Sequence, residues 1–348
     1  EWVQSTDPND IIGPAGYGEE HWVSGEATLP YIIRFVNQSD ATAPAQQVVI
    51  TQQLDPDLDY RTFRVTDFGW GDQYTEVGED LPFYLGRIEL TDGSGLVVDV
   101  LATVDVVSGL ATWILQTIDP ATGEPPEDAL AGFLPPNDEN GIGEGFVSYT
   151  IRPRSDAATW SIIDAEATIV FDTNEPIDTP PVFNTIDAVA PTSSVTEATN
   201  EFWTANIYVA WGGEDDGGSA LKDYNVYVSV DGGPYTIWLS HTTLTSAWFV
   251  GQQNHTYTFY CTSQDNAGNV EAFPSAPDVA IVIPLYEYET GDLNHDGYVD
   301  LADAVIALKV VSGVAFTDVY YLDKEVNEDG KIGSEELIYI LQKMAQLR

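Results

Sequence analysis

Oxygen-bearing side chains near the C-terminus are spaced as ligands of a calcium ion. In the segment from Asp292 to Asp303, such side chains stand at positions 1, 3, 5, 9 and 12, and Gly297 stands at position 6. Calcium takes six to eight oxygen ligands, and a loop of this kind turns alternate positions toward one ion, with glycine at the sharp bend and the carbonyl group of position 7 as a further ligand. The predicted ligands are Asp292, Asn294, Asp296, Tyr298, Asp300 and Asp303.

A second segment repeats this spacing in a less regular form. With Gly330 at position 6, a glutamate replaces the usual aspartate at position 1, and Gly333 at position 9 leaves room for a water molecule. The alternative is a loop that keeps this shape without metal. The predicted ligands are Glu325, Asn327, Asp329, Lys331 (through its carbonyl group) and Glu336.

Two further groups of oxygen donors are weaker candidates for a metal site. One group follows a predicted strand, where turn hydrogen bonds are the alternative role, and the other lies farther along the chain, where a charged loop is the alternative. We therefore expect two Ca2+ ions in the C-terminal region, and these two groups are the places where the β modules could hold further ions. The residues of the two groups are Asp172, Asn174 and Glu175, and Asp215, Asp216 and Asp265.

The elements around the two calcium loops are predicted to be helical. Four apolar residues follow the first loop at spacings of 4, 3 and 3, which places them on one helix face, and Gly313 stands where a C-cap is expected. The second loop is followed by a similar pattern, which includes Leu337, Ile340 and Leu341. The four residues of the first helix are Leu301, Val305, Leu308 and Val311.

The duplicated loop and helix resemble the dockerin family, whose paired EF-hand-type loops bind two calcium ions. The resemblance implies docking onto a cohesin-type partner through positions 10 and 11 of each loop. These positions hold Leu301 and Ala302 in the first loop and Ser334 and Glu335 in the second. Position 12 of the second loop is Glu336, where dockerins usually have aspartate.

The chain before residue 286 is predicted to be β. Short alternating apolar runs are separated by turn-rich stretches, which is typical of antiparallel sandwiches. The predicted fold is therefore mainly β, with two tandem antiparallel β-sandwich domains (1–185 and 186–285, immunoglobulin- or fibronectin III-like) and a small α-helical dockerin- or EF-hand-like domain (286–348). The predicted strands are 31–35, 48–52, 96–104, 111–118, 146–151, 165–171, 207–211, 224–230, 235–239, 257–261 and 279–283.

Both β modules resemble domains of bacterial surface proteins. The first, over residues 7–180, is similar to an uncharacterised β-domain near the C-termini of large secreted surface proteins, and the second resembles fibronectin type III or immunoglobulin-like repeats. The first resemblance rests on Asp7–Asp10, Leu29–Phe35, Phe146–Ile151 and Phe171–Pro176. The second rests on Trp211, Glu214–Ser219, Tyr224, Tyr257 and Asp265–Asn269.

Composition excludes several classes of function. The 56 acidic and 12 basic residues give a net charge of −44, which would repel nucleic acid. No apolar stretch is long enough to predict a membrane span. None of the common catalytic motifs is present, so a non-enzyme is expected.

These patterns predict an extracellular or cell-surface, secreted bacterial protein with a structural or adhesive role. It would assemble with neighbouring copies or a cohesin-like module, through the dockerin-like domain or through strand exchange by Glu1–Thr6, and a filament is one form of such assembly. The alternative is a carbohydrate-binding or cellulosome-type scaffolding module that docks to a cohesin-like partner and binds polysaccharide. Trp22, Trp70 and Trp238 are the candidate sugar platforms, with core packing as their other role.

Overall fold

The computed structural model describes residues 9–78, 80–201, 204–315, 317, 319–327 and 329–347. The segment Glu1–Thr6, predicted to exchange as a strand, lies outside them. The chain divides into two compact units. The first comprises Glu1–Pro191, Asp215–Leu221 and Gln264–Val270, and the second comprises Thr192–Glu214, Lys222–Ser263 and Glu271–Arg348. The fold is mainly β, as predicted.

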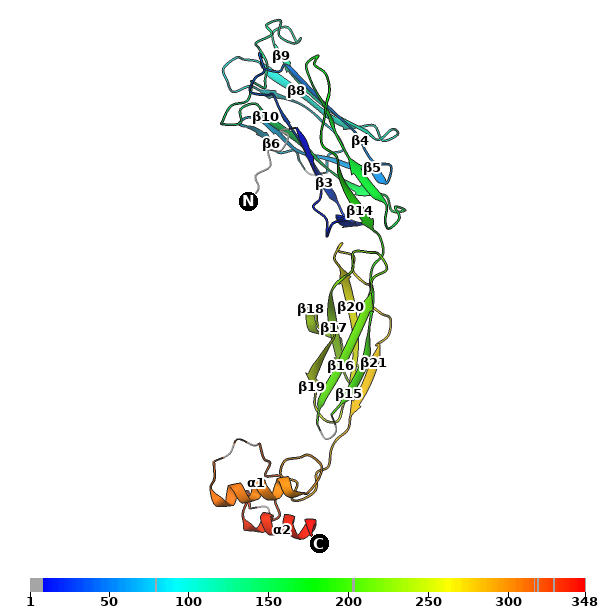
Figure 1. Cartoon of the computed structure of the whole chain (residues 1–348), viewed down its shortest axis with the longest axis vertical. Coiled ribbons are helices and arrows are strands. Elements are labelled where there is room, and N and C mark those ends of the chain that lie inside the picture. Colours follow the sequence, from blue (N-terminus) through cyan, green and yellow to red (C-terminus); the bar gives the residue numbers. More distant parts are fainter. Residues whose placement is uncertain are drawn as a thin grey trace. The chain divides into compact units, whose positions relative to one another are not determined.

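Two antiparallel sheets form most of the first unit (Figure 1). A five-stranded sheet has the order β1 (Asp10–Ile12), β3 (Leu29–Val36), β10 (Glu144–Pro153), β5 (Leu58–Trp70) and β6 (Gln73–Thr75). A six-stranded sheet has the order β13 (Ile177–Asp178), β12 (Thr168–Phe171), β4 (Gln47–Gln53), β9 (Leu110–Ile118), β8 (Val97–Val104) and β7 (Tyr84–Glu89).

The core of the first unit lies between these sheets and is rich in aromatic rings. Alternate residues of β3 are buried, as expected where one face of a strand packs on a core. The rings of Tyr31 and Tyr149 stack at 5.1 Å, and Phe63 and Trp113 pack against Tyr149. These four large buried side chains tie the two sheets together.

A smaller sheet completes the first unit. It has the order β11 (Ile162–Ala165), β14 (Val182–Asp187) and β2 (Trp22–Ser24), and β14 runs parallel to β2. Asn184 is buried in β14, and its side-chain NH2 group donates to the carbonyl oxygens of Pro14 and His21 at 3.0 Å each. These bonds fix the strand whose last residue is the buried Asp187.

The second unit begins with a sandwich of two sheets, in which β15, β16 and β19 are antiparallel, as are β18 with β17 and β20 with β21. One sheet has the order β15 (Thr192–Asn200), β16 (Asn206–Glu214) and β19 (Ser246–Val250). The other has the order β18 (Thr236–Thr242), β17 (Leu221–Val230), β20 (His255–Asp265) and β21 (Val279–Ile283). Leu221, the first residue of β17, and Gln264 and Asp265, the last two residues of β20, belong to the first unit.

Two helices follow, α1 (Leu301–Ser312) and α2 (Ser334–Met344). Gly313 ends α1 with φ +68°, and its amide donates to carbonyl oxygens of the last turn, so the predicted C-cap is confirmed. The helices share a small core of Leu293, Ala304, Ile306, Ala307, Ile332 and Ile340. Among the described residues, no helix has the length and apolar character needed to cross a membrane.

Candidate metal centres

The first predicted calcium loop folds around its own carboxylates. Asp292 and Asp303, at positions 1 and 12, are fully buried. Asp292 Oδ2 accepts from the amide of Gly297 at 2.9 Å, and this glycine has φ +90°, which a side chain would strain. Asp303 Oδ1 accepts from the amides of Leu293 and Asn294 at 2.7 and 3.1 Å, and its Oδ2 accepts from the amide of Asp300 at 2.9 Å.

The second loop repeats the main hydrogen bonds of the first. Glu325 at position 1 accepts from the amide of Gly330 at position 6, at 2.6 Å. Glu336 at position 12 accepts from the amides of Val326 and Gly333, positions 2 and 9, at 3.1 and 2.6 Å. Gly330 has φ +76°, so both loops turn at position 6 through a left-handed glycine, with aspartate or with glutamate at position 1.

Side chains within both loops turn inward in the same way. The oxygen at position 3 accepts from the amide of position 5, and the oxygen at position 5 accepts from the amide of position 7. The loops also meet at their entrances, where the amide of Gly291 donates to the carbonyl oxygen of Lys324 at 2.8 Å. These hydrogen bonds order each loop, although among the described residues no three of the acidic ligands predicted for either loop have oxygen atoms within 4.8 Å of one another.

The electrostatics of the first loop fit a cation. Asp292 Oδ1 is buried and has no hydrogen-bond partner. Burial, with a smaller contribution from the nearby charges of Asp303 and Asp296, raises the pKa of Asp292 to about 6. A divalent ion would give the orphaned oxygen a partner and neutralise the repulsion, because calcium prefers such hard oxygen ligands.

His295 lies at position 4 of the first loop and is enclosed by two tyrosine rings. Its ring stacks on Tyr288 at 4.0 Å and on Tyr321 at 3.9 Å, with interplanar angles of 8° and 4°. His295 Nε2 also lies 3.0 Å from Asp323 Oδ1. The stack joins the chain before the first loop to the chain before the second, a contact that residue spacing does not predict because Tyr321 lies 26 residues after His295.

The residues predicted to recognise a partner are exposed. Leu301 and Ala302 begin α1, and Ser334 and Glu335 begin α2. The predicted apolar face of α1 is also exposed, with 62% of Leu301 and 53% of Leu308 accessible. The helix buries Asp303, Ala304, Ile306 and Ala307 instead.

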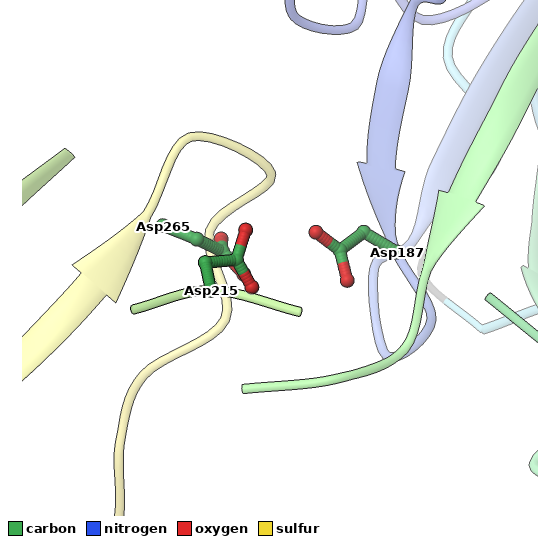
Figure 2. Close-up of side chains that lie close together, drawn as sticks. All are labelled: Asp187, Asp215 and Asp265. Atoms are coloured by element: carbon green, nitrogen blue, oxygen red, sulfur yellow. The ribbon is translucent and has the colours of Figure 1, made fainter. Parts of the chain in front are cut away.

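A third acidic centre lies in the first unit, where β14 ends. Oxygen atoms of Asp187, Asp215 and Asp265 all lie within 4.8 Å of one another. Figure 2 shows the carboxylate of Asp187 pointing toward those of Asp215 and Asp265. Among the described residues, no other group of three acidic, histidine or cysteine side chains converges this closely.

Each carboxylate of this centre is held by backbone amides. Asp187 accepts from Val189 and Ser219 at 3.1 and 3.2 Å, and Asp265 accepts from Gly268 and Asn269 at 2.7 and 2.8 Å. Asp187 and Asp265 are fully buried, and burial, together with the charge of Asp187, raises the pKa of Asp265.

The remaining oxygen of Asp215 is the one that lacks a partner. Asp215 Oδ1 accepts from the amide of Gly217 at 2.9 Å, whereas Oδ2 is buried without a hydrogen bond. No lysine or arginine in the described part of the chain pairs with the three carboxylates. Buried like charges without a counter-ion are costly, so this arrangement suits a cation.

The structure joins two of the three aspartates predicted in this module. Asp215 and Asp265 meet, but Asp216 is exposed and outside the group, and Asp187 takes the third place. The sequence analysis missed Asp187, which stands alone at the predicted boundary between the two β domains.

The other predicted group and the predicted sugar platforms do not form sites. Asp172 Oδ1 accepts from the amides of Gln46 and Gln47 at 2.9 and 2.8 Å, which is a turn role, and Asn174 and Glu175 are exposed beside it. Trp22 and Trp70 are buried, so neither offers a face to a sugar. Trp238 packs against Trp211, Phe249 and Phe259 in the second sandwich.

A family model described as a domain of unknown function (DUF7619) matches residues 7–96 and 132–185. The matched residues lie within the first β module, which was predicted to resemble an uncharacterised domain. The description of this family names no activity. No curated protein matches the chain.

Several solved structures have a distant similarity to the chain. The N-terminal domain of the Streptococcus gordonii adhesin Sgo0707 is 14% identical over 52% of this chain and 33% of its own, with a TM-score of 0.32. Domains D2 and D3 of the major pilin SpaD from Corynebacterium diphtheriae are 11% identical over 79% and 89%, with a TM-score of 0.33. The fibronectin(III)-like modules of Clostridium thermocellum CbhA are 11% identical over 79% and 94%, at 0.29.

These similarities are too low to transfer a fold or a function, because all three TM-scores lie below 0.5. This chain also spans only a third of the adhesin domain that it matches. What these proteins bind or build is therefore a property of those proteins alone.

Proposed function

We propose that this chain is a non-enzymatic, calcium-binding extracellular protein with a structural or adhesive role, and that its dockerin-like C-terminal region binds two calcium ions. The observation that carries the proposal is the repetition of one hydrogen-bond scheme in the loops 292–303 and 325–336, together with the buried, unpartnered Oδ1 of Asp292. Acidic loops that only face solvent have no reason to share this internal order.

The two ions can be counted on the full chain by isothermal titration calorimetry. Asp296→Ala and Asp329→Ala change the same position, 5, in the two loops. Each substitution is expected to remove one ion from the stoichiometry, because position 5 supplies a ligand in each loop. A stoichiometry that both variants leave unchanged would overturn the proposal.

We extend the proposal to a third calcium ion, held by Asp187, Asp215 and Asp265. Supporting it are the buried, unpartnered Oδ2 of Asp215 and the absence of a basic partner among the described residues. Asp265→Asn is expected to remove this ion, whereas Asp216→Asn, which changes the exposed neighbour, is expected to leave it. If both variants bind as many ions as the parent chain, the three aspartates bind no calcium.

For the docking surface we propose the exposed face of α1, made by Leu301, Val305, Leu308 and Val311. Four large apolar side chains on one exposed face are typical of a helix that a partner covers. The occupant that we favour is a second copy of this chain, and a cohesin-like module is the alternative that the dockerin resemblance implies.

Light scattering of the full chain with calcium, and again after chelation, tests this surface. Association in calcium is expected to be lost in Leu308→Glu but kept in Ile338→Glu, since these residues have similar exposure (53% and 54%) on different helices. A chain that stays monomeric in millimolar calcium at high concentration would exclude self-assembly, and an external partner would remain.

A further inference from the structure

The open face of the five-stranded sheet in the first unit carries a groove that the calcium chemistry does not involve. Its volume is about 730 Å3, within the range of small-molecule sites. Strands β3, β10, β5 and β6 supply its floor and walls, and the loop before β10 supplies Asn140 and Gly141. All of these residues belong to one compact unit.

Two aromatic rings lie side by side in this groove. Tyr74 on β6 is 61% exposed, and its ring centroid lies 6.3 Å from that of the partly buried Phe146 on β10, with an interplanar angle of 33°. The hydroxyl group of Tyr74 donates to Asp67 Oδ2 at 2.6 Å, which holds the ring in place. The two rings therefore form an oriented apolar platform in contact with solvent.

Glycines keep the floor of the groove low beside this platform. A Cβ atom at Gly69 would lie 3.1 Å from the ring of Phe146, and a Cβ atom at Gly145 would collide with the ring of Phe35. Gly71 has φ +49° at the turn between β5 and β6. A larger residue at Gly69 would press on the ring of Phe146, and one at Gly145 would press on the core ring of Phe35 beneath the groove, so both positions favour glycine.

The polar groups around the platform suit a neutral ligand. Gln73, Asn140, Asp72 and Glu144 offer amide and carboxylate groups that can bond to hydroxyl groups. Arg34, the arginine of the groove, is already paired in two bonds with Asp10. With two carboxylates and a neutralised arginine, the groove repels phosphate, sulfate and acidic sugars.

We propose that this groove binds a neutral polysaccharide, with Tyr74 and Phe146 as the stacking platform. The C–H groups on one face of a sugar ring are apolar and slightly positive, and they pack on the negative face of an aromatic ring. The hydroxyl groups at the edge of the sugar reach Gln73 and Asn140. Trp70 also lines the groove, but its side chain is buried, so Tyr74 and Phe146 supply the accessible rings.

Affinity electrophoresis of the full chain in gels containing soluble polysaccharide tests the proposal. The probes are mixed-linkage β-glucan, xylan, galactomannan and a soluble α-glucan, with polygalacturonate as the anionic comparison. At least one neutral polymer is expected to retard the chain. Tyr74→Ala and Phe146→Ala are expected to weaken this binding about tenfold, because each loses one stacked ring.

Two control variants separate a binding role from a folding role. Tyr74→Phe keeps the ring and loses only the bond to Asp67, so it is expected to bind within about twofold of the parent chain. Tyr17→Ala removes a similarly exposed tyrosine of the same unit, away from the groove, and is expected to bind normally. The proposal would be overturned if no neutral polymer retarded the chain, or if only polygalacturonate did. It would also be overturned if the parent chain and Tyr74→Ala were retarded equally. Calcium binding is measured separately, so either proposal can fail alone.

Discussion

The substitution Asp303→Asn tests the calcium loops most directly, because this residue holds the loop and the helix together. Asp303 Oδ1 accepts from the amides of Leu293 and Asn294, and Oδ2 accepts from the amide of Asp300, the N-cap of α1. An asparagine can keep the first two bonds through its oxygen. Its NH2 group, however, would face the amide of Asp300, so two donors would oppose each other.

Without calcium, the loss of unfolding free energy expected in Asp303→Asn is modest. A hydrogen bond to a charged group contributes about 1.5–3 kcal/mol, which is the loss expected at the Asp300 amide. Removal of the Asp303 charge offsets part of this loss, since that charge repels the buried carboxylate of Asp292. We therefore expect the chelated variant to be destabilised by about 1 kcal/mol.

With calcium, the expected loss of unfolding free energy is larger, and it tests ion binding directly. An ion at 100 times its dissociation constant stabilises the folded state by about 2.7 kcal/mol, so two ions contribute about 5 kcal/mol. Asp303→Asn should lose the contribution of the first loop and keep that of the second. The difference in unfolding free energy between calcium and chelator should therefore fall by about half.

Urea unfolding followed by circular dichroism at 222 nm measures this difference on the full chain, because the helices of the described residues lie between Leu301 and Met344. Glu335→Gln is the matched control, since it removes one carboxylate from the exposed first turn of α2 and leaves the loop bonds intact. An unchanged calcium increment in Asp303→Asn, or an equal loss in Glu335→Gln, would refute the reasoning.

Three further predictions concern other parts of the chain. Gly297→Ala should weaken calcium binding at the first loop and destabilise that loop by about 1–2 kcal/mol, because alanine is strained at φ +90°. The control Gly212→Ala, where an added Cβ atom meets nothing, should not change the calcium titration. Trp113→Ala should destabilise the first unit by about 3–5 kcal/mol in urea unfolding followed by tryptophan fluorescence, because the ring is fully buried among Phe63 and Tyr149, and the calcium count should stay the same. Cys261, whose pKa is raised to about 12 by burial, should resist a thiol-specific reagent at pH 8 in the native chain and react with one equivalent in urea, so rapid native labelling would contradict this burial.

The sequence predicted best where structure is local. Each predicted calcium loop is specified by the spacing of a few donors and one glycine, and both loops have the predicted turn at that glycine. Most predicted strands are also present, because alternation reports a strand with one buried face. The 13-residue β5 was missed, since charged residues such as Arg61 and Arg64 interrupt its apolar pattern and its pairing with β10 shifts register.

Contacts between distant residues could not be predicted from spacing. Asp187 joins Asp215 and Asp265 only because β14 ends beside two loops that lie far along the sequence. Nothing in the residues around Asp187 distinguishes it from a solvated aspartate of a linker. The aromatic groove was missed for a similar reason, because Tyr74 on β6 and Phe146 on β10 are far apart in the sequence and meet only across the intervening strand β5.

The helix α1 shows what an amphipathic pattern leaves undecided. The spacing of Leu301, Val305, Leu308 and Val311 correctly indicated one face, but that face is exposed, and the small residues Ala304 and Ala307 lie against the shared core. The helix contributes Ala304, Ile306 and Ala307 to the core that it shares with α2, which leaves its four larger predicted residues outside that core. The periodicity fixes which residues share a face, and tertiary packing decides whether that face is covered.

The loop and this exposed face are parts of one continuous element. Position 10 of the first loop is Leu301, the first residue of α1, and position 12 is Asp303, whose carboxylate bonds to the loop and caps the same helix. An ion held by the loop would therefore also fix the first turn of the helix that presents Leu301 and Val305. Because the two roles share a backbone, we expect calcium to control association by ordering the docking face, without contacting the partner itself.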